Sequence, residues 1–171
     1  TAINLSACLA EKGKKVLAID MDPQGNTTSG FGVDKNGIEN TLYELLLGEA
    51  ETKDTIVKDV VENLDLIPSN INLSGAEIEL VGIDDKEFIL KGITDKLRRK
   101  YDYIILDCPP SLNMLTINAL TAATSVLVPI QCEYYALEGL SQLIHTIDLV
   151  KERLNKRLKM EGVVFTMYDA R

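Results

Sequence analysis

Short apolar runs that end in an aspartate constrain the fold of this chain more than any other feature. VLAID at residues 16–20 and YIILD at residues 103–107 are apolar or aromatic up to the final aspartate. A strand with one face in water alternates apolar and polar residues, whereas a strand of a parallel sheet is buried on both faces and reads as a continuous apolar run. Both runs therefore predict buried strands of a parallel sheet.

The rest of the chain alternates between further apolar runs and helical patterns. Strands are expected at 64–68, 125–130 and 162–167. Helices are expected at 3–12, 41–47, 53–58, 73–80, 86–99, 112–123 and 137–158. This alternation predicts an α/β fold in a single domain over residues 1–171, with a mostly parallel, twisted sheet covered by helices on both faces.

Both aspartate-ended runs predict a ligand site, because open α/β sheets bind ligands at the carboxyl ends of their strands. Asp107 in YIILDCPP has the arrangement of a Walker B aspartate, which holds Mg²⁺ through water. Asp22 follows Asp20 by two residues and would face the same side if the strand continued. Taken singly, a structural strand end explains Asp107 equally well, and a turn at Asp22-Pro23 explains Asp22 better. Together at one sheet edge, they favour a phosphate and magnesium site.

Composition excludes several classes of function. The net charge of −8 rules out a positive field over the whole domain for nucleic acid. No apolar stretch reaches the roughly 18 residues of a membrane span, and no signal-peptide pattern opens the chain. The three cysteines lie far apart without metal-ligand spacing, so we expect reduced thiols and a cytoplasmic protein.

Three longer segments carry a specific resemblance. DMDPQGNTTSGFG (20–32), YDYIILDCPPSL (101–112) and PIQCEYYALEGL (129–140) resemble the ParA/Soj family of chromosome and plasmid partitioning ATPases. These are P-loop NTPases with a deviant Walker A loop, and residues 1–17 resemble the helix that follows this loop. The resemblance extends over essentially all 171 residues.

The resemblance implies ATP and Mg²⁺ as cofactors, a switch I region at 20–28 and a switch II region beginning at Asp107. It implies that Asp22 acts catalytically near the attacking water, while Asp107 reaches the metal through water. Asp20 is expected to support the metal as a second carboxylate. Thr166 and Met167 are expected near the adenine.

The same resemblance implies partners. It predicts an ATP-dependent homodimer, non-specific DNA binding through regions beyond this chain, nucleoid association, and stimulation of hydrolysis by a ParB/Spo0J-type partner. A MinD-like membrane-associated ATPase that regulates cell division is the alternative. An iron–sulfur reductase of the nitrogenase iron-protein type fits less well, because Cys132 lacks a suitable context.

One part of the family pattern is absent. The KGGVGKTT loop and the central strand before it would precede Thr1, and later helices would follow Arg171. We therefore expect a partial domain that hydrolyses ATP poorly, if at all, because positioning and charge stabilisation dominate phosphoryl transfer. We also expect an exposed strand edge, and a mobile loop over residues 21–40.

Overall fold

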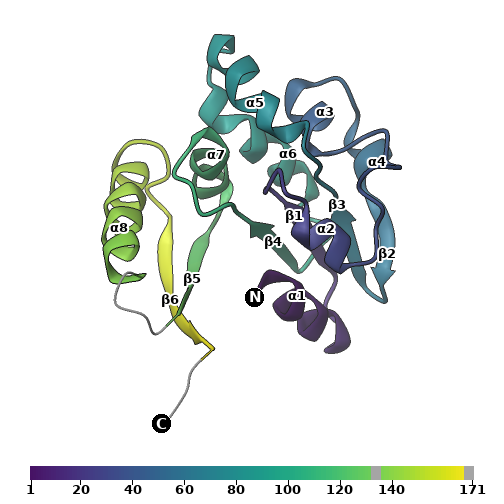
Figure 1. The fold of residues 1–171 in the computed structure, drawn as a ribbon, viewed down its shortest axis with the longest axis horizontal. Helices are drawn as coiled ribbons and strands as arrows, with labels where there is room; N and C mark the ends of the chain where they lie inside the picture. Colours follow the sequence, from purple (N-terminus) through teal and green to yellow (C-terminus); the bar gives the residue numbers. More distant parts are fainter. Residues whose placement is uncertain (132–135, 168–171) are drawn as a thin grey trace.

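The inner strand β1 (Val16–Asp20) organises a four-stranded sheet of order β2-β3-β1-β4. It pairs in parallel with β3 (Leu64–Ile67) and β4 (Tyr103–Asp107), and the edge strand β2 (Val57–Val61) runs antiparallel to β3. The register aligns Asp20 with Asp107. The computed structural model describes residues 1–131 and 136–167 (Figure 1). It confirms the bounds of both strands predicted from VLAID and YIILD; β1 is fully buried as predicted, whereas β4 is only partly buried and its Tyr103 is exposed.

Helices cover both faces of this sheet, as predicted, and β1 contributes to both cores because successive side chains point to opposite faces. Leu17 and Ile19 lie in the larger core, whereas Val16 and Ala18 pack in the smaller one. The larger core is built with α3 (Leu42–Leu47), α5 (Leu73–Glu79), α6 (Ile89–Leu97) and α7 (Met114–Ala122). The smaller core is closed by α1 (Ala2–Glu11).

A second sheet pairs β5 (Ser125–Gln131) with β6 (Lys159–Thr166) in parallel and lies beside α8 (Ala136–Arg153) (Figure 1). A groove of about 1400 Å³ is lined by residues of both β4 and β5. Among the described strands, β4 and β5 do not pair with each other. This agrees with the expected exposed strand edge. The predicted motif at 129–140 overlaps residues 132–135, which lie outside the described residues.

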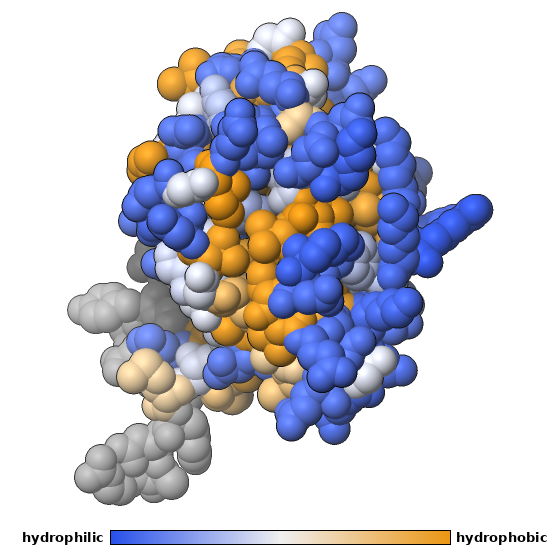
Figure 2. All heavy atoms as spheres, turned by 90° about the vertical axis from the view of Figure 1, so that its right-hand side faces the viewer, coloured by the Kyte–Doolittle hydropathy of each residue, from blue (hydrophilic) through white to orange (hydrophobic). Residues whose placement is uncertain are grey.

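Two expectations about the elements are wrong. The helix expected at 53–58 is the short α4 (Thr52–Thr55), and β2 follows it at once. β2 is an antiparallel edge strand that pairs with β3. Its sequence is not a continuous apolar run, so the pattern used to predict the inner strands does not detect it. Lys58 and Asp59 of β2 are exposed, and Figure 2 shows hydrophilic residues around an apolar centre on this side of the molecule.

The helix expected at 137–158 ends at Arg153, and β6 begins at Lys159. Asn155 explains this end, because its side-chain amide donates to the carbonyls of Leu120 and Ala123 at 2.9 and 2.8 Å. These bonds hold the turn against the end of α7. The connection between α5 and α6 contains two short helical turns, Leu80–Gly82 and Lys86–Phe88.

A polar cluster lies at the opposite, amino-terminal end of the strands. The Asp65 carboxylate accepts hydrogen bonds from the Lys58 ammonium, the Tyr101 hydroxyl and, at 2.9 Å, the Asp59 amide. Burial raises the pKa of Asp65, but these hydrogen bonds outweigh it, so the pKa lies below its usual value of 3.8. Asp65 therefore stabilises the fold above the unfolded-state pKa, and this contribution is lost as the pH falls through the folded-state pKa.

We predict that Lys58→Met lowers the free energy of unfolding at pH 7 by about 1–2 kcal/mol, because a largely buried carboxylate loses its cationic donor. The deficit should shrink below pH 3.8, where Asp65 becomes protonated. Urea denaturation at several pH values measures both effects. Lys53→Met is the matched control, because the Lys53–Glu51 pair is exposed and contributes little. Equal losses in the two variants would contradict the role of Asp65.

Candidate active site

Asp20, the last residue of β1, is fully buried and its carboxylate is bonded at both oxygens. Oδ2 accepts from the amide and from the hydroxyl of Thr28, each at 2.7 Å, and Oδ1 accepts from the Asp22 amide at 3.2 Å. Thr28 lies in α2 (Asn26–Gly30), a short helix within the predicted loop. The carboxylate therefore ties the loop to the end of the central strand.

The pKa of Asp20 is raised above 3.8, mainly because burial disfavours the charged form. Hydrogen bonds from Thr28 and Asp22 act in the opposite direction, and the nearby charge of Asp107 adds to the rise. The donors of the loop thus offset part of the cost of burying this group. The first half of the loop is consequently anchored to the end of β1, and the mobility that we expected of residues 21–40 stays a prediction.

Asp107 ends β4 directly beside Asp20. Its backbone carbonyl accepts from the Met21 amide at 2.8 Å, and its Oδ2 accepts from the Thr27 hydroxyl. The Met21 side chain is fully buried in the larger core. Within residues 1–131 and 136–167, Oδ1 of Asp107 accepts no hydrogen bond, so this oxygen is available to a ligand.

Asp22 lies at the start of the loop and is half-buried. Its Oδ1 accepts from the Gln24 amide at 2.9 Å, and its backbone carbonyl accepts from Gly25 N and from Ser69 Oγ at 2.9 Å each. The backbone of Asp22 is therefore fixed. Its second carboxylate oxygen receives no hydrogen bond from the part of the chain that the structure describes, which leaves it free to orient a water molecule.

The turn after Asp22 requires a glycine. Gly25 has φ +62°, in the left-handed region, and a Cβ added there would lie 2.8 Å from the Ser69 carbonyl oxygen. Ser69 follows β3 and donates its amide to the Thr28 hydroxyl at 2.9 Å. The loop after β1 and the end of β3 are therefore packed backbone to backbone.

Thr27, Thr28 and Ser69 were not predicted as site residues. Their partners lie 80, 8 and 41 residues away along the chain, respectively. The only local signal was a pair of threonines in a segment rich in glycine and asparagine. These residues position the aspartates rather than replace them.

The donor set suits Mg²⁺, which prefers oxygen ligands and binds through one or two carboxylates while keeping several waters. Among the described residues, no group of three His, Cys, Asp or Glu forms a complete metal cage. Asp107 offers a free carboxylate oxygen beside threonine hydroxyls. Both oxygens of Asp20 are already bonded to the loop, so its part in the metal shell stays a prediction, and its observed contacts organise the site.

Thr166 and Met167 lie at the carboxyl end of the second sheet. The Thr166 hydroxyl donates to the Ile130 carbonyl at 3.2 Å, and the Met167 side chain is 84% exposed. None of their described hydrogen bonds joins them to the three aspartates. Their assignment to the adenine therefore stays a prediction.

Comparisons with known proteins bear on this arrangement. A family model described as an AAA domain matches residues 1–160. The sporulation initiation inhibitor protein Soj of Bacillus subtilis (strain 168) is 56% identical over all 171 residues, which cover 68% of Soj. The chain belongs to the ParA/Soj family. The chromosome partitioning protein ParA of Myxococcus xanthus is 54% identical to this ParA/Soj member, which covers 60% of its length.

Solved structures agree with this family. One is described as cobyrinic acid a,c-diamide synthase from Mycobacterium smegmatis with bound ATP analog and magnesium. It is 42% identical, with a TM-score of 0.93 over 99% of this chain and 68% of its own. A plasmid partition protein from Borrelia burgdorferi is 32% identical, with a TM-score of 0.83 over 99% of this chain and 73% of its own. The P-loop NTPase fold class is thereby confirmed.

We predict that Thr28→Val destabilises the protein by about 2–4 kcal/mol at pH 7, because the Asp20 carboxylate and the Ser69 amide both lose a buried partner. The variant raises the pKa of Asp20 further. Between the Asp20 pKa values of the two folded proteins, the variant binds more protons than the wild type, so the deficit grows as the pH rises through this range above 3.8. Urea denaturation across pH measures this trend.

Thr28→Ser keeps the hydroxyl and is the matched control, with an expected loss below about 1.5 kcal/mol. Equal destabilisation of the two variants would show that the methyl group, rather than the hydrogen bonds, stabilises this loop.

Proposed function

We propose that the protein to which this chain belongs is an ATPase of chromosome or plasmid partitioning that hydrolyses ATP to ADP and phosphate with Mg²⁺. The alignment of Asp20 with Asp107, with Asp22 at the start of the adjoining loop, carries this proposal. The chain spans 60% of the length of the M. xanthus ParA and 68% of that of Soj. The activity is accordingly proposed for the longer polypeptide.

In this proposal each aspartate has a separate task. Mg²⁺, when bound, supplies positive charge that polarises the phosphate oxygens. Asp107 holds the metal shell through water with its free Oδ1. Asp22, whose backbone is fixed by Ser69 and Gly25, orients the attacking water with its free oxygen. Asp20 keeps the Thr27–Thr28 segment in place beside Asp107.

The wider partition functions rest on the resemblance and on the names of the relatives. We propose an ATP-dependent homodimer, non-specific DNA binding outside these 171 residues, nucleoid association and stimulation by a ParB/Spo0J-type partner. The relatives are named Soj and ParA, and one solved neighbour is named a plasmid partition protein, which supports partitioning over the MinD-like alternative. In the described part of the chain, no helix is both long and apolar enough to cross a bilayer.

We predict that Asp22→Ala lowers ATP turnover of the longer polypeptide by about 10²–10⁴-fold, because the attacking water loses its orienting carboxylate. ATP-dependent dimerisation and DNA binding should persist, since Asp107 and the loop anchors are unchanged. Phosphate release measures the turnover. Light scattering measures dimerisation and, with DNA added, DNA binding.

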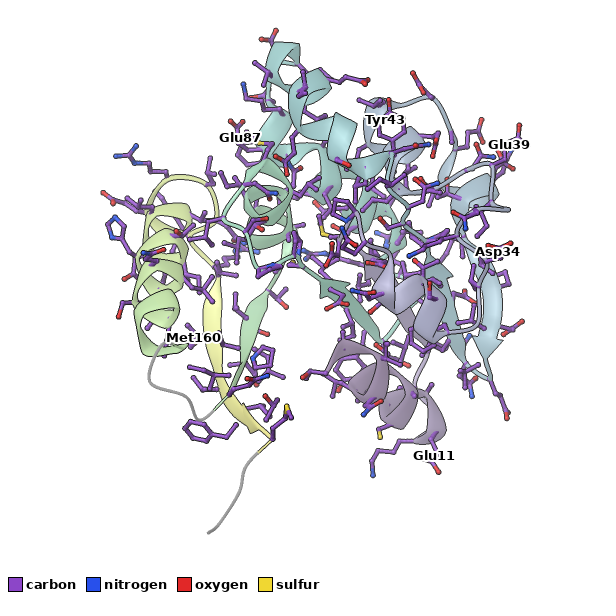
Figure 3. All side chains as sticks on the ribbon, viewed as in Figure 1. Glu11, Asp34, Glu39, Tyr43, Glu87 and Met160 are labelled. Carbon is purple, nitrogen blue, oxygen red and sulfur yellow. The ribbon has the colours of Figure 1, made fainter. Side chains whose placement is uncertain are left out.

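Asp34→Ala is the matched control, because Asp34 lies later in the same loop and is exposed (Figure 3). Its turnover should equal that of the wild type. Normal turnover in Asp22→Ala would refute the catalytic role of Asp22, and a loss of both turnover and dimerisation would show that Asp22 is needed for nucleotide binding instead.

We also predict that the 171 residues alone bind ATP weakly and without dependence on Mg²⁺. The three aspartates repel a triphosphate, and the KGGVGKTT motif, whose amides cradle phosphates, does not occur in these 171 residues. Isothermal titration with and without Mg²⁺ tests this. Tight, Mg²⁺-dependent binding would show that a Walker A loop is dispensable for this chain.

A further inference from the structure

Two basic runs of the sequence meet at the amino-terminal end of the first sheet, opposite the three aspartates. The runs are EKGKK at 11–15 and KLRRK at 96–100. The Lys15 amide donates to the Asp102 carboxylate at 2.8 Å, and the Lys15 carbonyl accepts from the Asp102 amide at 2.7 Å. These bonds join the segment before β1 to the segment before β4. Lysines from distant parts of the sequence are thereby brought to one end of the sheet.

A cavity of about 270 Å³ lies where the two runs meet. Every residue that lines it is polar or charged, and three of them are lysines. The lining consists of Lys15, Lys58, Asp59, Asn63, Asp65, Lys100 and Tyr101. We call it the lysine cavity. Three ammonium groups around one cavity contrast with the net charge of −8 of the whole chain, so the cavity is a local positive site on an acidic protein.

An irregularity in β2 supplies two of the lining residues. Along a regular strand, successive side chains point to opposite faces. The register between β2 and β3 shifts between Val57 and Val61, and Asp59 has φ +52°, in the left-handed region. A bulge of this kind re-aims side chains. The consecutive residues Lys58 and Asp59 consequently both line the lysine cavity.

The donors that remain free in this cavity are cationic. Lys58 Nζ donates to the Asp65 carboxylate and, at 3.0 Å, to the Tyr101 hydroxyl. An ammonium group has three N–H donors, so one of them is left for a ligand. Within residues 1–131 and 136–167, the ammonium groups of Lys15 and Lys100 form no hydrogen bond or ion pair. An anion with several acceptor oxygens can therefore be contacted by three lysines.

We propose that the lysine cavity binds the phosphate group of a small soluble molecule. The oxygens of a phosphate accept charge-assisted hydrogen bonds, and lysines bind phosphate as point charges. Lys15 and Lys100 supply unpaired positive charge, and the third N–H of Lys58 supplies a further donor. The lysine cavity lies at the opposite end of the strands from the three aspartates, so binding there is independent of the function proposed above.

The phosphate groups of DNA have the same chemistry, but the surroundings favour a small ligand. Asp59 at the cavity and the neighbouring Asp102 are both exposed. An extended polyanion would meet these carboxylates and the negative charge of the whole chain as well as the lysines, which costs free energy. A single phosphate group that fits within the cavity contacts the ammonium groups without crossing the acidic surface around them.

The test is isothermal titration of inorganic phosphate, and separately of pyrophosphate, into the 171-residue chain in a buffer free of phosphate. We expect saturable binding that weakens as salt is added. Lys15→Gln and Lys100→Gln should each weaken the binding about tenfold, because each variant removes one ionic hydrogen bond. Both lysines are exposed, so urea denaturation of these variants should match that of the wild type.

Lys14→Gln and Arg99→Gln are the matched controls. Each removes one positive charge directly beside a lining lysine, but neither residue lines the lysine cavity. These variants should bind phosphate within about twofold of the wild type. Equal losses in the lining and the neighbouring variants would overturn the proposal, because the attraction would then be diffuse. An absence of saturable phosphate binding to the wild type would overturn it too.

A short DNA duplex, titrated in place of phosphate, distinguishes the two sources of the phosphate group. We expect no duplex binding that depends on Lys15 or Lys100. If the duplex binds, these two variants abolish that binding and free phosphate does not bind, a small ligand is refuted. None of these measurements involves ATP or its turnover, so failure here is distinguishable from failure of the proposed function.

Discussion

The buried carboxylate of Asp20 is the constraint on which the candidate site depends. A carboxylate that is removed from water at the end of a strand must be supplied with donors from the protein. The loop after β1 supplies them through Thr28 and Asp22, and Ser69 then supplies a donor for the Thr28 hydroxyl. The strand, the loop and the end of β3 are therefore one hydrogen-bonded unit. The position of Asp22 at the start of the loop follows from that unit.

The local sequence was sufficient to predict strands that are continuous apolar runs. It was insufficient for elements whose structure depends on a contact with a distant part of the chain. VLAID and YIILD predicted the bounds of β1 and β4 to the residue, because a continuous apolar run is typical of a strand in a parallel sheet, although β1 is fully buried and β4 only partly. β2 and the end of α8 were missed, since one is held by β3 and the other by Asn155 against α7. The positions of Asp20 and Asp107 at strand ends were predictable, whereas the role of Asp22 rests on the family resemblance and stays a prediction. Thr27 and Ser69 were not predictable, because their partners lie tens of residues away.

Two loops that flank the aspartates are each held by a residue from a neighbouring element. Ser69 holds the loop after β1, and Glu77 holds Asn113 in the loop after β4. Both residues lie between β3 and the end of α5, so residues 68–80 support the site from two sides.

Met21 has a mechanical consequence for any conformational change at this edge. Its side chain is fully buried, and its amide extends the β1–β4 ladder to the Asp107 carbonyl. The backbone is thus fixed up to residue 21. Gly25, four residues further along the chain, packs closely against the Ser69 carbonyl. A hinge at the amino-terminal end of this loop has only the intervening residues 22–24 in which to rotate. Because the Asp22 carbonyl is itself bonded to Ser69 Oγ and to Gly25 N, any such rotation must first break these two hydrogen bonds.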